Sequence, residues 1–402
     1  MNRNIATAGN SGTGVRSDCE ITIELKGKNG IIIDLESKVK TLYGESIRTL
    51  CNEVLQFFDI RNALVKINDS GALPFVISAR IEAAIKNLTD TDLEFLPDMA
   101  SGNRYATTPD RFRFSRLYVP GNTPSMMINA GLHSADGIIL DLEDSVAPEK
   151  KDEARILVRN ALRQIDFYGA ERMVRINQGE SGLKDLRAVL PNNVNLILLP
   201  KCDNAGQILK VESEISVVRK QLKLKNPVFL MPIVESALGI ENSFEIARAA
   251  ESVVALAIGL EDLTTDLGVP RTDEGTESLY ARERLIMAAK AAGIQPVDSV
   301  FSDVSDMEAL RRNVLISKAM GFEGMGCIHP SQVPVVNEGF APDENETEKS
   351  KKIVLAYEEA RKKGLGVVAL GSKMIDPPVV ARARKIIELT IKLGKLNPDW
   401  IN

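Results

Sequence analysis

The chain of 402 residues has few of the side chains that usually bind transition metals. It contains two histidines, His133 and His329, and four cysteines that share no CxxC or Cys/His spacing. Zinc sites and disulfide frameworks need such spacings, so we expect neither. The hydrophobic share of 44% and the charged share of 26% are those of an ordinary globular protein with a packed core.

Long apolar runs and basic blocks are also missing. The apolar runs are of strand length, below the ~20 residues that a membrane helix needs, and the start, MNRNIATAGNSGTG, has no apolar signal region. The net charge is −5, and no Lys/Arg block alternates with aromatics, which argues against a nucleic-acid surface. We therefore expect a cytoplasmic protein with neither a membrane nor a nucleic acid as partner.

A small α+β unit is predicted at residues 1–92. Two β-rich runs, CEITIEL and GIIIDL, are split by the turn GKNG and precede an amphipathic stretch, and ALVKIND and FVISARIEAAIKNL complete the unit. The polar, turn-rich residues 93–112 are typical of a linker.

Between residues 113 and 340, eight short apolar runs alternate with amphipathic segments. The runs are RLYV (116–119), GIILDL (137–142), MVRI (173–176), NLILLP (195–200), VFLMPIV (228–234), VVALAIG (253–259), QPVDSV (295–300) and GMGCI (324–328). This alternation predicts a parallel sheet, and eight units fit a (β/α)8 TIM barrel. An open, doubly wound sheet is the alternative, weakened because no GxGxxG opens a helix. The polar connection and helical patterns of residues 341–402 predict a C-terminal helical lid.

Polar residues end nearly every predicted strand, and in a barrel they meet at one mouth. They are Asp141, Glu143, Asp144, Arg175, Asn177, Lys201, Glu235, Glu261, Asp262, Asp298 and His329. An oxygen-rich set that lacks cysteine suits Mg²⁺ better than Zn²⁺. Solvated strand-end charges are the alternative interpretation. We expect His329 to have a structural role. For Lys201 the sequence leaves both a structural and a functional role open.

Eight segments, in order along the chain, carry a resemblance to a known family. They are LYVPGN (117–122), DLEDSVAPEKKDEAR (141–155), VRIN (174–177), LPK (199–201), PIVESALG (232–239), GLEDLTTDLG (259–268), CIHPSQ (327–332) and GSKMID (371–376). The chain resembles the citrate lyase β-subunit, malyl-CoA lyase and citramalyl-CoA lyase family. The resemblance implies a (β/α)8 barrel, a homo-oligomer that is usually trimeric, one Mg²⁺, and retro-Claisen cleavage of a 3-hydroxy-acyl thioester to a 2-oxoacid and an acetyl thioester.

The resemblance also implies the metal ligands. Glu235 and Asp262 fall at the glutamate and aspartate that bind the metal directly in the family. Two carboxylates leave positions for water and for the hydroxyl and carboxylate of the substrate. Glu143 and Asp144 match residues that would accept hydrogen bonds from the metal-bound waters.

Two further residues match catalytic positions of the family. Arg175 matches the arginine that faces the thioester carbonyl, where a fixed cation stabilises enolate charge; a salt bridge to the mouth carboxylates is its alternative role. Asp376 matches the lid aspartate, which in the family comes from a neighbouring subunit and acts as general acid/base. Many relatives carry an arginine where this chain has Phe114, so neither Arg113 nor Arg116 is assigned a catalytic role, and either can pair with a surface acid.

The N-terminal unit resembles the acyl carrier subunit of citrate lyase. The resemblance lies in GTGVRSD (12–18), YGESIRTLCNEVL (43–55) and DSGALPFVISARIEAAI (69–85). Such carriers attach a CoA-derived arm to the first serine of a GTLESSD-like segment. Aligning the final SD pair places Arg16 there, with Ser17 beside it, so we expect no covalent arm and a free CoA thioester as substrate.

Three alternative functions stay open. The chain could be the β-subunit of a citrate lyase complex that acts on a carrier-bound citryl thioester, together with other lyase subunits. It could be a metal-dependent aldolase acting on free hydroxy-oxoacids, which would need neither thioester nor carrier. It could also be a non-catalytic scaffold, although the intact acids at every matched position argue against that.

Overall fold

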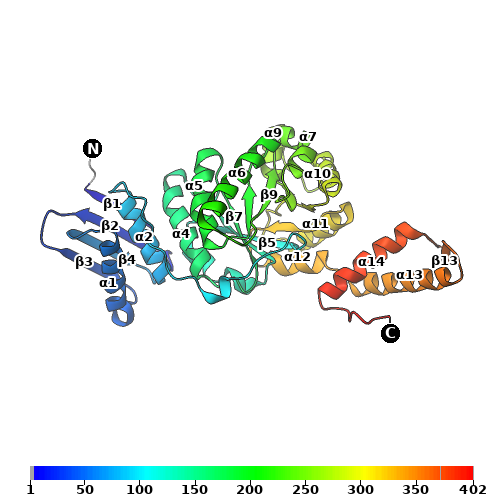
Figure 1. The fold of residues 1–402 in the computed structure, drawn as a ribbon, viewed down its shortest axis with the longest axis horizontal. Helices are drawn as coiled ribbons and strands as arrows, with labels where there is room; N and C mark the ends of the chain where they lie inside the picture. The colour runs from blue at the N-terminus through cyan, green and yellow to red at the C-terminus, as the bar shows by residue number, and fades with distance from the viewer. Residues whose placement is uncertain (1–3, 372, 402) are drawn as a thin grey trace. The chain divides into compact units, whose positions relative to one another are not determined.

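The computed structural model describes residues 4–371 and 373–401. These form two compact units, which divide between Val333 and Pro334. Among the described residues, no helix is long and apolar enough to cross a membrane. Figure 1 shows the order of the elements along the chain.

The first unit begins with a four-stranded sheet and two helices. The sheet has the order β1-β2-β4-β3, with β3 parallel to β4 and the other neighbours antiparallel. Strand β1 was not predicted from the sequence. The elements are β1 (Ile5–Gly9), β2 (Cys19–Leu25), β3 (Ile31–Ser37), α1 (Lys40–Phe57), β4 (Ala63–Asp69) and α2 (Pro74–Lys86).

Eight parallel strands follow, in the order β11-β10-β9-β8-β7-β6-β5-β12. A parallel bridge between Asp298 and Met325 joins the two ends of this order. The predicted TIM barrel and all eight predicted strands are confirmed, and the open-sheet alternative is wrong. The strands are β5 (Ser115–Pro120), β6 (Gly137–Asp141), β7 (Glu171–Arg175), β8 (Leu196–Leu199), β9 (Phe229–Val234), β10 (Ala255–Ile258), β11 (Gln295–Val297) and β12 (Met325–Cys327).

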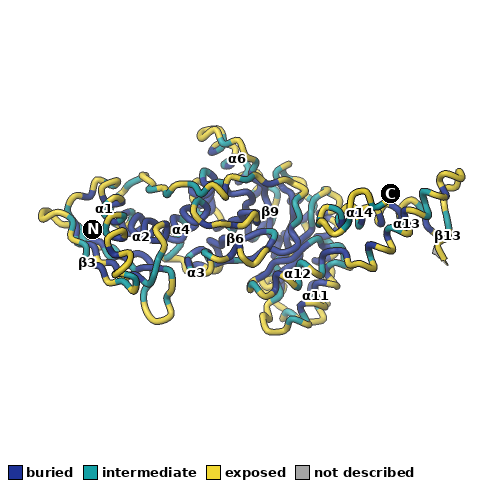
Figure 2. Tube along the Cα trace, turned by 90° about the horizontal axis from the view of Figure 1, so that it is seen from below, coloured by how far each residue is buried: buried dark blue, intermediate teal, exposed yellow. Residues whose placement is uncertain are grey.

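The strands carry apolar side chains on both faces because the barrel interior and the surrounding helices bury both. Ile139, Met173, Leu198, Met231 and Ala257 belong to one buried cluster, and Figure 2 shows β6 and β9 in the buried part of the chain. The helices after β5 are α3 (Pro124–Met127), α4 (Lys151–Gln164), α5 (Gly179–Val189), α6 (Ala205–Leu222), α7 (Ala237–Glu241), α8 (Ser243–Ala247), α9 (Leu260–Leu267), α10 (Leu279–Ala292), α11 (Met307–Met320) and α12 (Gln332–Phe340).

Buried ion pairs hold the N-terminal sheet against the barrel. Arg80 on α2 donates two hydrogen bonds to Asp18, at 3.0 and 2.9 Å, and lies 3.6 Å from Glu153 on α4. Arg159 on α4 donates to both oxygens of Glu82 on α2, at 2.8 and 2.7 Å. All five side chains are less than a tenth exposed, so charge pairing inside the contact fixes the two parts to each other.

Residues 93–112, which we predicted to be a linker, are hydrogen-bonded to the barrel. Asn103 donates to the carbonyl of Ile165 at 2.6 Å, and Thr107 donates to Glu171. Arg113 pairs with the same Glu171 at 2.7 Å. The acid that partners Arg113 is therefore buried, whereas we had expected an acid on the surface.

The second unit contains two long helices and a short hairpin. The helices are α13 (Glu344–Lys362) and α14 (Pro377–Lys392), and strands β13 (Val368–Leu370) and β14 (Lys373–Ile375) pair antiparallel between them. Ile353, Val354, Ile375, Val380 and Ile387 form its apolar core. This unit thus has a core of its own.

Candidate active site

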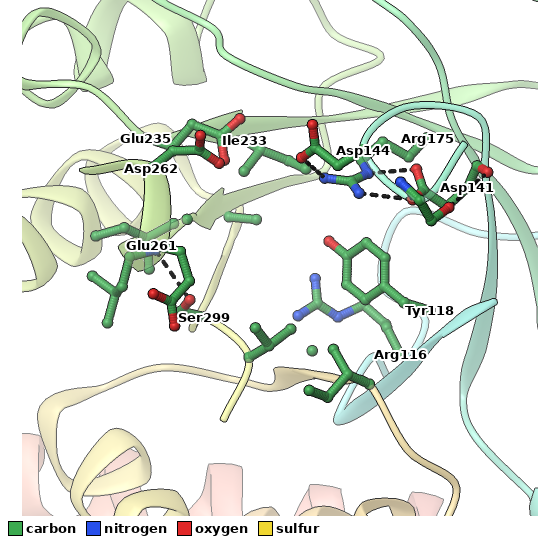
Figure 3. Close-up of a pocket in the computed structure, with 18 of the residues that line it drawn as sticks. Arg116, Tyr118, Asp141, Asp144, Arg175, Ile233, Glu235, Glu261, Asp262 and Ser299 are labelled. Atoms are coloured by element: carbon green, nitrogen blue, oxygen red, sulfur yellow. Dashed lines mark hydrogen bonds and ion pairs between the residues drawn. The ribbon is translucent and has the colours of Figure 1, made fainter. Parts of the chain in front are cut away.

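A cavity of about 440 Å³ opens at the carboxyl ends of the barrel strands. It is lined by residues of β5, β6, β7, β9, β10 and β12, by the first turn of α9 and by residues that follow β11 (Figure 3). The polar lining comprises Arg116, Tyr118, Asp141, Asp144, Arg175, Glu235, Glu261, Asp262, Asp298 and Ser299. Most of the polar residues predicted at the mouth therefore meet in one cavity.

Glu235 lies at the end of β9 and is 5% exposed. Its Oε1 accepts a hydrogen bond from the backbone N–H of Lys201 at 2.7 Å, and Lys201 adopts a left-handed φ of 51° there. Burial, together with the negative charges of Asp262 and Glu143, raises the pKa of Glu235 to about 8. A carboxylate in this position calls for a nearby positive charge.

Gly259, just before α9, leaves room for Glu235. A Cβ atom at position 259 would lie 2.2 Å from Oε2 of Glu235 and 2.9 Å from its Cβ. Any larger residue would push the glutamate out of its place. The glycine thus sets the position of a buried carboxylate.

We predict that Gly259→Ala destabilises the protein by about 1–3 kcal/mol, because the added methyl overpacks the site. Thermal unfolding would measure the loss. Gly102→Ala is the matched control, since nothing lies within 4 Å of a Cβ at Gly102. Equal melting temperatures for Gly259→Ala and the wild type would contradict this close contact.

Arg175, at the end of β7, is held by three acids. It donates to both oxygens of Asp141, at 2.6 and 2.8 Å, and lies 3.0 Å from Glu143 and 3.2 Å from Asp144. Burial alone would raise the pKa of Asp141, but the hydrogen bonds and charge of Arg175 hold it below its ordinary value. Arg175 therefore does form the salt bridge to the mouth carboxylates that the sequence left open as its alternative role. Asp141 is the partner that fixes the orientation of its guanidinium.

Lys201 connects this cluster to the other acids. Its Nζ lies 2.9 Å from Glu143, 3.4 Å from Asp144 and 4.0 Å from Asp262. Although burial acts in the opposite direction, the hydrogen bond and charge of Glu143 raise the pKa of Lys201 above its ordinary value. The side chain that the sequence left ambiguous is therefore a cation among the mouth acids.

Arg116 lines the same cavity, although sequence reasoning assigned it no role. It is 1% exposed and forms no ion pair with any described residue, so the expected surface acid is not its partner. A sequence signal for it exists, because alternate residues of a barrel strand face inward, and Arg116, Tyr118 and Pro120 of β5 all line the cavity.

Three predicted polar residues have partners outside the cluster of Glu235, Arg175 and Lys201. His329 is exposed and shares a hydrogen bond of 2.7 Å with Ser331. Glu261 lines the cavity and pairs with Arg271 at 2.7 Å. Asp376 belongs to the second unit, where its side chain accepts the backbone N–H of Val379 and caps α14.

Two family models match the chain. The model of HpcH/HpaI aldolase/citrate lyase matches residues 115–330, which is more than half of the chain. A second model, ACP, described as the malonate decarboxylase delta subunit (MdcD), matches residues 6–88. The predicted carrier-like N-terminal domain is thereby confirmed.

Known relatives match about 70% of this chain. Citrate lyase subunit beta of Leuconostoc mesenteroides subsp. cremoris is 38% identical over 70% of this chain and 94% of its own length. Human mitochondrial citramalyl-CoA lyase is 32% identical over 69% of this chain and 85% of its own. The L-malyl-CoA/beta-methylmalyl-CoA lyase of Rhodobacter capsulatus is 30% identical, covering 69% and 95%.

Solved structures agree with these matches. Protein CitE from Mycobacterium tuberculosis, crystallised with magnesium, acetoacetate and coenzyme A, is similar with a TM-score of 0.59 and 29% identity, covering 70% of this chain and 98% of that one. The CitE complex with magnesium and pyruvate gives a TM-score of 0.53 at 28% identity, covering 69% and 98%. With its barrel, its cavity and these matches taken together, the chain belongs to the HpcH/HpaI aldolase/citrate lyase family.

Proposed function

We propose that the chain is a Mg²⁺-dependent lyase that cleaves a 3-hydroxy-acyl thioester of CoA to a 2-oxoacid and an acetyl thioester. Carbon–carbon lyase activity is common to the named relatives, and magnesium and coenzyme A are present in the similar CitE structure. The observation that carries the proposal is the buried Glu235 beside Asp262, with Arg175 in the same cavity. Residues 1–92, 113–340 and 341–402 would be carrier-like domain, catalytic barrel and lid.

The residues of the cavity fit a magnesium ion. Glu235 is a buried carboxylate whose pKa is raised partly by Asp262, and a divalent cation between the two would relieve that repulsion. No group of three or more His, Cys, Asp or Glu side chains that could hold a metal occurs among the described residues. Two protein ligands, completed by waters and substrate oxygens, suit Mg²⁺, which usually keeps several waters.

Glu235 and Asp262 would hold the metal, and Glu143 and Asp144 would accept hydrogen bonds from its waters. When bound, Mg²⁺ supplies a Lewis acid for the hydroxyl and carboxylate of the 2-oxoacid half. The neighbouring Lys201 pairs with Glu143 and Asp144 and keeps these carboxylates in place.

The remaining chemistry concerns one electron pair and one proton. A base takes the hydroxyl proton, the hydroxyl carbon becomes the carbonyl of the 2-oxoacid, and the pair of the broken carbon–carbon bond stays on the acyl half. Arg175, oriented by Asp141, stabilises the resulting thioester enolate. Asp376, as the general acid/base, would be that base, and it would return the same proton to the enolate carbon to give the acetyl thioester.

Mass-spectrometric detection of products from malyl-, citramalyl- and citryl-thioesters tests the proposal. Cleavage of at least one free CoA thioester is expected. Turnover only of free hydroxy-oxoacids would identify an aldolase instead, and turnover only of a carrier-bound citryl thioester would identify a citrate lyase β-subunit. If the folded protein turns over none of these compounds, the non-catalytic scaffold is the remaining alternative.

We predict that the working site is shared between subunits of a homo-oligomer. Asp376 lies in the second compact unit, and the family implies that it serves a neighbour. Asp376→Ala and Asp262→Ala should each be inactive alone, whereas mixed oligomers should regain part of the activity because some sites contain both acids. Mixing Asp262→Ala with Glu235→Ala is the control, since both changes lie in one barrel. No recovery despite proven subunit exchange would place Asp376 in its own subunit or outside the chemistry.

The N-terminal unit, which would carry an arm, contacts barrel residues that follow β5 and β6. The N–H of Gly9 donates to Glu153 at 2.9 Å, Lys150 donates to the Gly9 carbonyl at 3.1 Å, and Arg80 donates to Asn122 at 2.7 Å. These barrel residues follow β5 and β6. Asp18, next to Ser17, accepts a hydrogen bond from the same Arg80 at 2.9 Å, so this segment is linked through Arg80 to Asn122 after β5. Ser17 itself is half-buried, with a left-handed φ of 56°.

We predict that the N-terminal domain is unmodified, because arginine cannot form the phosphodiester that an arm needs at position 16. Protein purified from its native host should have the mass of the unmodified sequence and should cleave a free CoA thioester. A Ser17→Ala variant is the control: it should be lighter only by the one oxygen atom removed, and its rate should be unchanged. A CoA-arm adduct on Ser17 would contradict the prediction and favour a carrier-bound substrate.

A further inference from the structure

Arg116, a buried arginine near the start of β5, has no acidic side chain as a partner within residues 4–371 and 373–401. Among the described residues, Arg116 makes no ion pair, and its Nε, although buried, has no hydrogen-bond partner. Its Nη1 donates only to the sulfur of Met231, at 3.0 Å, and thioether sulfur is a weak acceptor. Burial lowers the pKa of Arg116 to about 10, so the guanidinium is still charged at neutral pH.

Such a charge is costly unless an anion accompanies it. Three other large buried arginines each face an acid, since Arg80 faces Asp18, Arg113 faces Glu171 and Arg159 faces Glu82. The fourth, Arg172, makes no ion pair with a described residue but donates to the backbone carbonyls of Asn193 and Tyr105, both at 2.7 Å. Arg116 differs from them in lining a cavity rather than packed protein. An anion that completes it must therefore come from the contents of that cavity.

The barrel makes room for this side chain on both sides. In the strand register Arg116 lies opposite Gly137 of β6 and Gly326 of β12. A Cβ at Gly137 would lie 2.4 Å from Cε of Met173 and 3.4 Å from Cγ of Arg116, and one at Gly326 would lie 2.7 Å from Cγ1 of Val300 and 3.1 Å from the Tyr118 ring. The two glycines therefore let Met173 and Val300 pack beside Arg116 and Tyr118, and Gly326 itself lines the cavity.

Tyr118 supplies a second donor beside the guanidinium. Its hydroxyl makes no hydrogen bond within the part of the chain that the structure describes, and burial raises its pKa, so it keeps its proton. In Figure 3 the Arg116 guanidinium lies next to the Tyr118 ring, across the cavity from Glu235 and Asp262. Two donors thus face the carboxylates from the other side of one cavity.

We propose that Arg116, with Tyr118, binds a second carboxylate of the substrate, so that the 2-oxoacid released is a dicarboxylate such as oxaloacetate. This inference rests on the proposed function, in which the first carboxylate and the hydroxyl are held near Glu235 and Asp262. A guanidinium binds a carboxylate through two charge-assisted hydrogen bonds. A substrate with a methyl group at this position, which would release pyruvate, leaves Arg116 buried and unpaired. The protein therefore selects a citryl-type thioester over a citramalyl-type one.

Binding of unreactive analogues tests the inference independently of turnover. Malate and lactate share the 2-hydroxy acid group and differ in having a second carboxylate or a methyl group. Titration calorimetry of the wild-type protein with excess Mg²⁺ should give malate a Kd at least tenfold below that of lactate. In Arg116→Met the ratio should fall below threefold, and Arg116→Lys should give an intermediate ratio. Arg187→Met, a change of an exposed arginine on α5, should keep the wild-type ratio.

Kinetics give the second measurement. The ratio of kcat/KM for citryl-CoA to that for citramalyl-CoA should exceed ten in the wild type and fall at least tenfold in Arg116→Met. Equal binding of malate and lactate by the wild type, or an unchanged ratio in a folded Arg116→Met variant, overturns the inference. If the wild type cleaves none of the malyl-, citramalyl- and citryl-CoA thioesters, the proposed function fails, and the analogue titrations still decide the role of Arg116.

Discussion

Asp262→Asn is expected to lower kcat/KM by a factor of about a thousand or more. The change removes one of only two carboxylates that would hold Mg²⁺, and a Lewis acid at the reacting oxygens contributes several kcal/mol to transition-state stabilisation, with each 1.36 kcal/mol equal to about tenfold in rate. The fold should persist, because the Asp262 side chain is 43% exposed at the cavity. Calorimetric titration with Mg²⁺ should show weakened binding.

Asp266→Asn is the matched control for this experiment. Asp266 lies on the same helix as Asp262 but outside the cavity lining, where it accepts the backbone N–H of Ala237 at 2.7 Å, so its change should alter kcat/KM less than threefold. Chelation of the wild-type enzyme should abolish turnover, and added Mg²⁺ should restore it. Full activity in excess chelator, or an Asp262→Asn variant that works at the wild-type rate, would rule out the metal site proposed here.

Arg175→Lys is expected to lower kcat about a hundredfold or more, with a smaller change in KM. Lysine keeps the charge but loses the planar fork that binds both oxygens of Asp141, so the cation moves away from the developing enolate. Loss of one oriented donor to an oxyanion costs about 10²–10³ in kcat. Steady-state kinetics with a cleaved CoA thioester provide the measurement.

A second variant separates catalysis from stability. Removing Arg175 alone leaves Asp141 buried and unpaired, which costs about 3–5 kcal/mol. The double variant Arg175→Met/Asp141→Asn removes both charges and should fold better than Arg175→Met, while its kcat stays low. If Arg175→Lys retained kcat within threefold of the wild type, Arg175 would be only a structural partner of the acids, and its role in stabilising the enolate would be excluded.

The barrel was predictable because each strand is buried on both faces. A run such as GIILDL has no polar face, and eight such runs between amphipathic segments leave few architectures. Strand β1 was missed because IATAG is short and rich in small residues, and its pairing with β2 depends on a long-range register. Local patterns reveal burial, but not which distant strand lies alongside.

The site was predictable to the extent that strand ends converge. Polar residues that follow barrel strands meet by geometry, so Glu235, Asp262 and Arg175 could be placed at one mouth from the sequence. Arg116 could not be placed in the same way, since it lies near the start of β5 and its importance depends on the absence of a partner. An absent partner becomes visible only when all neighbouring side chains have positions.

The buried ion pairs between the N-terminal sheet and the barrel bear on whether the barrel can fold by itself. A cut near residue 92 would remove Arg80 from Glu153 and Glu82 from Arg159, although Glu153 would keep Lys150 and Arg159 would keep Glu94 as partners. The same cut would remove helix α2, whose side chains are almost all buried, and would expose to water the barrel surface that it covers. Exposed apolar surface of this kind favours association, so an isolated barrel should aggregate more readily than the full chain when it is expressed.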